Sequence, residues 1–519
     1  MKLAFRDPRR RAAARTRFLA LPALLASVAW TGAAPAQQAP TPAPPSEEMR
    51  LPVAPPVGGI DTAAQAPETL SASDAFGEFR HAFDAGRYQA AAPYARRVLQ
   101  LAEAEAKTPV DEEVQVALMN LAMTQYLMGD YVGAEASYSR AIETVKSSGR
   151  PLHARLARAY AGLAATYHEG KRHDLAVENF QQAVALTRRH EGLLTEAQVP
   201  LLEKYIDSLT ELGRLPEALQ GYKYILRIAT RKYGETSPAL APTLERIGRW
   251  YTQVGLYDQA RRTFRRAIEL VEAGEGQKSP KLIGPLTALA ACNRRQLIDP
   301  DQELFTVPDA ERTTLYHDPA MGPPATVSPQ TLVSEGERAL LRAADIAEER
   351  TEPSPVQVAD VRTQVGDWYQ SRGMAERALP NYQKAWLAAS RVTQQHEGKP
   401  IVEALFGAPV LLQIVRPEGW DRFAARPPEQ VETRNVVVEF TVKADGFADR
   451  VKVIDDSGDA RRAQKTAEAL HTARYRPRME NGSPVATTGI SFTQPWILLL
   501  PEVEDGKSSP APTKQDSAS

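Results

Sequence analysis

Apolar and small residues recur along most of this chain at the spacing of one face of a helix. Four stretches show the pattern best: "GDYVGAEASYSRAI" (129–142), "GRLPEALQGYKYIL" (213–226), "GLYDQARRTFRRAI" (255–268) and "GMAERALPNYQKAW" (373–386). In each, a glycine is followed five residues later by a small residue, and four residues after that by an aromatic residue. Because residues four apart lie on the same side of a helix, the pattern predicts a turn at the glycine and then a helix with one buried stripe.

The stripe repeats at a fixed distance along the chain. Its small residue is 42 or 43 residues from the next one, until a last interval of 118. A constant period of this size indicates stacked pairs of antiparallel helices, in which the small residue lets the two helices of a pair cross closely. The small residues are Ala91, Ala134, Ala176, Ala218, Ala260 and Ala378, and the aromatic residues that we expect to pack between units are Tyr138, Phe180, Tyr222, Phe264 and Tyr382.

These residues resemble the tetratricopeptide repeat, in a spaced form with about eight extra residues per unit. The resemblance covers residues 72–392 and implies a mainly α fold, a helical solenoid. One unit departs from the pattern, because "LIGPLTALAACNRRQL" (282–297) has the character of a first helix while its second helix is delayed to 331–349. The proline-rich stretch 298–330 between them predicts an insertion, which is either functional or disordered.

The period changes from helical to alternating near the end of the chain. "NVVVEFTVKADGFADRVKVIDD" (435–456) predicts two strands around a turn at Ala444–Gly446, and residues 459–473 have helical spacing with Asp459 as the cap. "RYRPRM" then leads through the turn at Asn481 and Gly482 to a last strand. The order strand, strand, helix, strand, strand predicts a small α+β domain over residues 405–501.

This C-terminal pattern resembles the C-terminal domain of TonB, the energy transducer of Gram-negative envelopes, in "VEFTVKADG", "DSG" and "ARYRPRMENGSPV". The resemblance implies docking of a partner by strand addition at an exposed sheet edge. The alternative is an edge blunted by Pro484 and Pro495. The upstream Tyr-Pro segment of transducers is replaced here by "APVLLQIVRPEGWDRFAARPP" (408–428). The predicted partner-binding edge strand carries Val485, Thr487, Gly489, Ser491 and Thr493.

The N-terminal residues have the features of an export signal. Arginines precede the apolar stretch "FLALPALLASVAW", and small residues ending in "AAPA" follow it, which predicts a signal peptide over residues 1–36. The alternative is an uncleaved N-terminal anchor in the membrane. Proline-rich residues 37–71 predict an extended linker, and polar residues 502–519 predict a disordered tail. The single cysteine, Cys292, excludes an intramolecular disulfide and is expected to be a small core residue.

Composition and motifs argue against catalysis and against nucleic-acid binding. The formal net charge is −1, and no basic stripe with interleaved aromatic residues is present. The sequence contains none of the common zinc, nucleophile, phosphate-loop or dinucleotide motifs. We therefore predict a non-enzymatic protein without a metal or other cofactor.

The repeat resemblance directs attention to the inner face of each first helix, which lines a concave binding surface in that family. This chain carries charges of both signs there, which predicts either a groove for a protein or peptide segment or simply a solvated face. The predicted groove residues are Arg80, Arg158, Glu169, Glu203, Asp207, Glu211, Glu245, Arg249 and Asp367.

Together these features predict a periplasmic adaptor, whose solenoid binds one protein partner of the envelope while the terminal domain docks another. The alternative is a divergent TonB-type transducer, anchored in the inner membrane through residues 18–34 and paired with an outer-membrane transporter. Membrane contact is expected only if the N-terminal segment is retained.

Overall fold

A computed structural model describes residues 69–108, 111–149, 154–298, 327–393, 395–396, 399–422 and 430–500. The predicted signal peptide, nearly all of the linker, most of the 298–330 insertion and the predicted tail lie outside these residues. The described residues divide into two compact units, which meet between Ile346 and Ala347. We call them the repeat unit (residues 69–346) and the C-terminal unit (residues 347–500).

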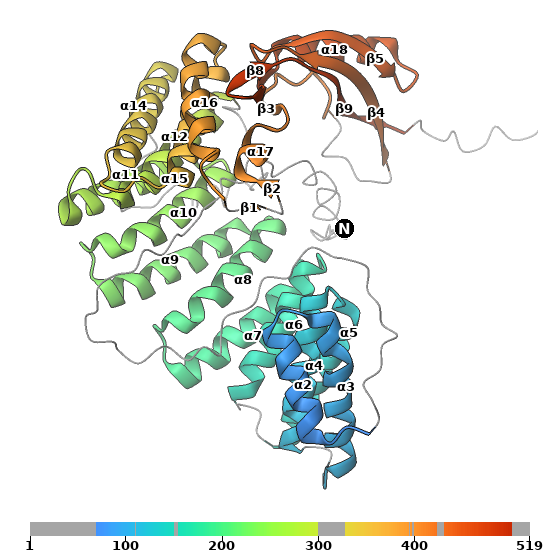
Figure 1. The fold of residues 1–519 in the computed structure, drawn as a ribbon. Coiled ribbons are helices and arrows are strands. Elements are labelled where there is room, and N and C mark those ends of the chain that lie inside the picture. The colour runs from blue at the N-terminus through green and yellow to red at the C-terminus, as the bar shows by residue number, and fades with distance from the viewer. Residues whose placement is uncertain are drawn as a thin grey trace, which may run out of the picture. The chain divides into compact units, whose positions relative to one another are not determined.

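The repeat unit is built from antiparallel helix pairs (Figure 1). Its first five pairs are α2 (Ala72–Asp84) with α3 (Tyr88–Glu105), α4 (Glu112–Met128) with α5 (Tyr131–Ser147), α6 (Ala154–Glu169) with α7 (His173–Glu191), α8 (Val199–Glu211) with α9 (Leu215–Tyr233), and α10 (Ala241–Gln253) with α11 (Tyr257–Glu275). Helices α12 (Ile283–Ile298) and α14 (Pro329–Glu348) follow, and the short 3-10 helices η2 (Glu196–Gln198), η3 (Pro238–Leu240) and η4 (Pro280–Leu282) precede α8, α10 and α12.

The expected stripe of small and aromatic residues forms the interior of these pairs. All six repeat alanines are 0% exposed, and the five repeat aromatics are at most 5% exposed. The glycines predicted at the turns between helices have a left-handed backbone, with φ of 80° at Gly129 and 72° at Gly373. Glycine adopts this conformation without steric cost. Hydrophobic burial between neighbouring helices is therefore what stacks the units.

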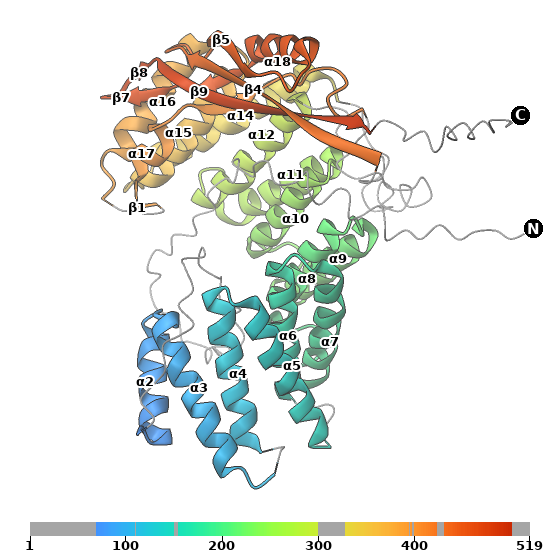
Figure 2. The same cartoon turned by 90° about the vertical axis from the view of Figure 1, so that its right-hand side faces the viewer.

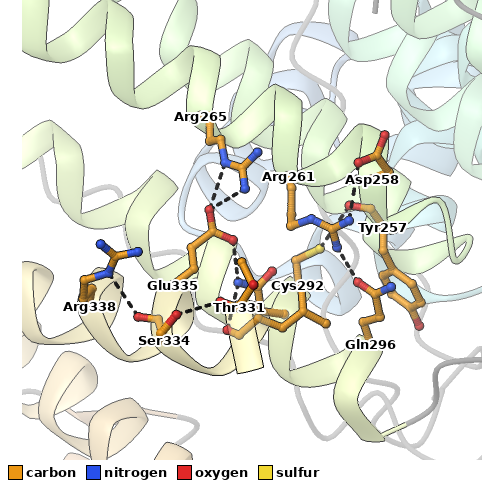
Figure 3. Close-up of polar contacts among 12 residues, drawn as sticks. Tyr257, Asp258, Arg261, Arg265, Cys292, Gln296, Thr331, Ser334, Glu335 and Arg338 are labelled. Atoms are coloured by element: carbon orange, nitrogen blue, oxygen red, sulfur yellow. Dashed lines mark hydrogen bonds and ion pairs between the residues drawn. The ribbon is translucent and has the colours of Figure 1, made fainter. Parts of the chain in front are cut away.

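The delayed second helix of the interrupted unit is α14, which packs against α12 and α11 (Figure 3). Glu335 of α14 accepts hydrogen bonds from Nε and Nη2 of Arg265, at 2.8 and 2.6 Å, through one carboxylate oxygen. Its other oxygen accepts from Asn293 Nδ2 at 2.9 Å, and the same amide donates to the Leu332 carbonyl at 3.2 Å. Helix α14 therefore returns to the place of a second helix despite the long separation in sequence.

Cys292 lies in the same region, in the middle of α12 (Figure 3). Its side chain is 0% exposed, and its Sγ lies 3.7 Å from the carbonyl oxygen of Tyr257. Burial raises the pKa of the thiol to about 11. The prediction of a small core residue is confirmed.

The C-terminal unit begins with one more helix pair and continues into strands. Its elements are α15 (Pro355–Gln370), α16 (Ala375–Ala389), β1 (Gln395–His396), β2 (Lys399–Pro400), α17 (Ile401–Phe406), β3 (Val410–Gln413), β4 (Val431–Val442), β5 (Ala448–Asp455), α18 (Ala460–Thr472), β6 (Arg474–Arg476), β7 (Arg478–Glu480), β8 (Ser483–Val485) and β9 (Thr487–Leu499). Asp459 caps α18 as predicted, its carboxylate accepting from the Arg462 N–H at 3.0 Å.

Three long strands form an antiparallel sheet in the order β5-β4-β9 (Figure 2). The register pairs Val442 with Ala448 on one side of β4 and Val431 with Leu499 on the other. One face of this sheet packs Val436, Val438 and Phe440 against α18, where Trp496 Nε1 donates to Thr466 Oγ1 at 3.2 Å. The predicted small α+β domain is therefore a three-stranded sheet with one helix on its inner face.

The last part of the chain differs from the predicted single strand. Asn481 and Gly482 form the expected turn, with φ of 51° and 77°, but it joins the three-residue strands β7 and β8. The strand is interrupted at Ala486, and β9, which follows, pairs antiparallel with β4. Val485 was wrongly placed on the edge strand, because it lies in β8 opposite Arg478.

No helix among the described residues is long and apolar enough to cross a membrane.

Candidate functional site

The charged residues of α6, α8 and α10 form one row, which we call the charged row: Glu169, Glu203, Lys204, Asp207, Glu211, Glu245, Arg246 and Arg249. Ion pairs link neighbouring first helices, since Lys204 of α8 lies 3.2 Å from Glu169 of α6 and Arg246 of α10 pairs with Glu203 of α8. Within α10, Arg249 Nε donates to Glu245 Oε1 at 3.1 Å. The structure thus brings together six of the nine predicted groove residues.

Two carboxylates of the charged row differ from the rest. Within the part of the chain that the structure describes, neither Asp207 nor Glu211 has a hydrogen-bond or ion-pair partner, whereas the three cations of the row are all paired. Asp207 is exposed to solvent, yet the protein around it raises its pKa to about 6 by desolvation. Lys204 opposes this rise in pKa, and the charges of Glu211 and Glu169 add to it. Asp207 is therefore an incompletely compensated carboxylate.

Two histidines lie beside this part of the row, at the turn between α6 and α7. Their rings are 5.3 Å apart in an edge-to-face arrangement. His168 Nδ1 is 2.9 Å from Ser208 Oγ, and burial lowers its pKa to about 4. His173 is 4% exposed, and neither of its ring nitrogens has a hydrogen-bond partner among the described residues. Burial lowers the pKa of His173, while the charge of Glu211 acts in the opposite direction.

The other predicted groove residues of the repeat unit lie apart from these contacts. Arg80 of α2 is exposed and pairs with Asp84 one turn along its own helix, at 3.6 Å. Arg158 of α6 is also exposed. Both side chains of this pair are exposed, so the charge of Arg80 is accessible to solvent and to a partner. Such a pair within one helix contributes little to stability.

Asp367 of α15 was predicted to line the groove, and the structure corrects this prediction. Its side chain is 4% exposed and accepts hydrogen bonds from Arg476 Nε at 2.9 Å and Arg476 Nη2 at 2.7 Å. Tyr382 of α16 donates a further hydrogen bond to Asp367 Oδ1 at 2.9 Å. Asp367 is unavailable to a partner because the chain's own strand β6 covers it.

Arg476 is the partner of Asp367 that sequence reasoning missed. Burial by itself would lower the pKa of its guanidinium, but the Asp367 carboxylate more than offsets this, so that the pKa is raised. Its remaining Nη1 donates to the Leu405 carbonyl at 2.8 Å. The sequence signal was the "RYRP" run, which marks β6 but does not identify an acidic partner 109 residues away.

Further contacts join the same helix pair to the strands of the C-terminal unit. Gln370 Nε2 donates to the Asp445 carbonyl at 2.7 Å, and the Tyr382 ring lies edge-on to Phe406 at 6.0 Å. A small apolar cluster joins Ala359, Ala388 and Ala389 to α17. Helices α15 and α16 are therefore part of the packing of the C-terminal unit.

Strand β9 forms one edge of the three-stranded sheet, since it pairs with β4 and with no other strand that the structure describes. Four of the five predicted edge residues lie on it. Gly489, Ser491 and Thr493 are exposed, Thr487 is half-buried opposite Val442, and Gly489 adopts a φ of 71° at a register shift. Pro495 also lies in β9, as is typical of edge strands.

The side chains in the described ranges do not form a recognisable metal-binding site. No group of three or more histidine, cysteine, aspartate or glutamate residues is placed to hold a metal ion there. The features that remain are an exposed charged row and an exposed sheet edge, both of which are suited to binding.

Comparison with known families agrees with both parts of this architecture. The tetratricopeptide repeat family model matches residues 113–189 and 199–273, and the model of the Gram-negative bacterial TonB protein C-terminal matches residues 430–494. The chain is a tetratricopeptide repeat protein with a TonB-like C-terminal domain. Tetratricopeptide repeats indicate protein–protein interaction, and the TonB-like domain suggests association with the cell envelope.

Solved structures similar to this chain share little sequence identity with it. One is a Podosopora anserina protein described as a kinesin light chain with nearly identical TPR-like repeats, with 13% identity over 47% of this chain and 99% of that one, and a TM-score of 0.32. Another is BtubC from P. vanneervenii, with 13% identity over 64% and 94% of the two chains and a TM-score of 0.26. The apo quorum sensor NprR from B. thuringiensis has 15% identity over 62% and 89%, and a TM-score of 0.31. No curated protein matches the sequence at a significant level.

Proposed function

We propose that this protein is a non-enzymatic adaptor of the periplasm, in which the charged row binds one protein partner and strand β9 docks another by strand addition. The observation that carries the proposal is the pairing of β9 on one side only among the described strands. A strand with a free row of N–H and C=O groups is a template for an extended segment of another chain. Because the two binding regions share one chain, each would raise the effective concentration of the other's partner.

The alternative function is a membrane-anchored transducer that serves an outer-membrane transporter, and the match to the TonB C-terminal favours it. The two functions differ in what happens to residues 1–36. Intact mass and N-terminal sequencing of protein from soluble and membrane fractions separate them. A soluble chain that begins near Gln37 supports the adaptor, whereas a membrane-bound chain that retains residues 1–36 supports the transducer.

Site-specific photocrosslinking in cells tests the binding regions directly. A benzoylphenylalanine at Thr493, on β9, should capture an envelope protein, and the same group at Arg461, exposed on α18, is the matched control. For the charged row, the equivalent pair is Arg246 on α10, which belongs to the row, and Glu178 on α7, both exposed. Adducts that form only from Thr493 and Arg246 support the proposal, and equal yields at test and control positions contradict it.

A further inference from the structure

Asp207 and Asp367 occupy the same place in the repeat. Each lies eleven residues before its repeat alanine, Ala218 or Ala378, and fifteen residues before its repeat aromatic, Tyr222 or Tyr382. We call this place the inner position. It holds an aspartate in α8 and α15, whereas Arg80 and Arg249 occupy it in α2 and α10.

The phenol beside the aspartate is also shared by the two sites. Tyr382 donates to Asp367 at 2.9 Å. At the other site, α8 and α9 cross at the residues that precede Asp207 and Tyr222, because a Cβ on Gly221 would lie 2.6 Å from Cγ1 of Ile206. Burial raises the pKa of Tyr222, and the negative charge of Asp207 raises it further. Each site therefore combines an aspartate from the first helix with a tyrosine from the second.

At Asp367 the chain shows what this combination binds. The planar guanidinium of Arg476 meets both carboxylate oxygens, at 2.9 and 2.7 Å, and reaches the site from the short extended strand β6. Two parallel N–H donors match the geometry of a carboxylate, which a lysine ammonium does not reproduce.

At Asp207 no cation of the described residues pairs with the carboxylate. Lys204, Arg246 and Arg249 are each paired with another carboxylate, and Glu211 lies one helical turn after Asp207 on the same face of α8. His173, which is nine-tenths buried without a hydrogen-bond partner on either nitrogen among the described residues, feels the charge of that same Glu211.

We propose that Asp207, Tyr222 and Glu211 form an arginine receptor on the charged row, which takes an arginine side chain from an extended segment of a protein partner as Asp367 takes Arg476. This inference rests on the proposed function, in which the row binds a partner, and it names the chemistry of that partner. Charge complementarity favours a basic segment, because the uncompensated charges of the row are carboxylates and its cations are already paired.

The chain supplies a suitable probe in the sequence that fills the other site. A fluorescein-labelled peptide of residues 473–479, "ARYRPRM", capped at both ends, should bind the full chain in an anisotropy titration. The variant Asp207→Asn should weaken this binding about tenfold or more, because a charge-assisted bidentate contact is lost. A peptide in which lysine replaces all three arginines should bind similarly weakly.

A matched control keeps this experiment decisive. Asp345→Asn removes an exposed aspartate of α14 and should leave the affinity unchanged. A circular dichroism melt checks that Asp207→Asn is folded, and Asp207→Glu provides a second variant that keeps the charge and should retain more affinity than the asparagine. Equal binding by the wild type and Asp207→Asn would overturn the inference, as would equal loss in the Asp345→Asn control.

The crosslinking position Arg246 separates this inference from the function on which it rests. If the crosslink from Arg246 forms in the wild type and also in Asp207→Asn, the row binds a partner but the arginine receptor is wrong. If the crosslink forms in the wild type and is lost in Asp207→Asn, both are supported. If it forms in neither, the proposed function of the row fails as well.

Discussion

Asp207 and Asp367 are the same residue at the same inner position, and the two units of the molecule treat them differently. In the repeat unit, Asp207 faces solvent without a hydrogen-bond or ion-pair partner among the described residues, and desolvation raises its pKa to about 6. In the C-terminal unit, Asp367 is buried and holds Arg476 through two hydrogen bonds. The difference lies in what covers the first helix, since β6 packs against α15 while Asp207 of α8 stays exposed.

This comparison shows that the inner position does not have one role along the array. An aspartate there is part of the internal packing where the chain supplies an arginine, and it is an accessible carboxylate where none of the described residues supplies one. A buried ion pair with additional hydrogen bonds specifies one docked geometry, because either charge left alone in the interior is costly. We therefore expect α15, α16 and the strands of the C-terminal unit to fold and unfold together.

The largest expected effect comes from breaking the buried pair. Arg476→Ala should lower the free energy of unfolding of the C-terminal unit by about 3–5 kcal/mol, because it leaves Asp367 charged and buried. Urea denaturation followed by tryptophan fluorescence measures this loss. Arg461→Ala, at an exposed position of α18, should change the stability by about 0.5 kcal/mol or less. A similar small change in Arg476→Ala would show that the pair does not hold the unit together.

A smaller loss of stability is expected from replacing two glycines that lie against a repeat aromatic, Gly248 in the repeat unit and Gly366 in the C-terminal unit. A Cβ at Gly248 would lie 2.5 Å from the Phe264 ring, and one at Gly366 would lie 2.3 Å from the Tyr382 ring. Gly248→Ala and Gly366→Ala should each lower the free energy of unfolding by about 1–3 kcal/mol through overpacking. Thermal melts compare them with Gly77→Ala, where nothing lies within 4 Å and alanine should stabilise the helix slightly. If all three variants melt alike, close packing at this position is not required.

Replacing Asp207 and Asp367 with asparagine should change the free energy of unfolding in opposite directions at neutral pH. The raised pKa of Asp207, about 6, means that the folded state binds more protons than the unfolded state between about pH 4 and pH 6, so that this group's contribution to stability is lost as the pH rises across that range. Asp207→Asn should therefore raise the free energy of unfolding at pH 7, by about 1 kcal/mol or less because the side chain is exposed to solvent. Below pH 4 the gain should vanish.

Stability curves for Asp207→Asn and Asp367→Asn between pH 4 and 8 test this difference. Asp367→Asn should be destabilising at pH 7, since it leaves Arg476 charged and unpaired in the interior. Two variants with the same sign at pH 7 would contradict the contrast between an open and a filled site.

The smallest expected effect concerns the thiol. Because burial raises the pKa of Cys292 to about 11, the native chain should react with no equivalent of Ellman's reagent at pH 8, and with one equivalent in guanidinium chloride. This inertness also allows an engineered cysteine at Ser491 on β9 to be labelled selectively. Rapid reaction of the native wild-type chain would show that α12 opens readily.

Much of the fold could be predicted because its determinants are local or periodic. The repeat alanines and aromatics predict helix pairs wherever they occur, since each residue acts through neighbours at fixed helical spacing. The same holds for the cap at Asp459 and the turn at Asn481, whose partners lie within a few residues. The course of β8 and β9 could not be predicted in the same way, because the pairing of β9 with β4 joins residues that are far apart along the chain, from Val442 with Thr487 to Val431 with Leu499.

The sequence by itself determined the class of this protein, a tetratricopeptide array followed by a TonB-like domain, and it marked the charged positions of the first helices. Only the tertiary structure decided that Asp207 is open and Asp367 is closed. The physical reason is that desolvation and charge pairing depend on what lies within a few ångströms in space. For Asp367 that neighbour is Arg476, which periodicity along the chain does not reveal.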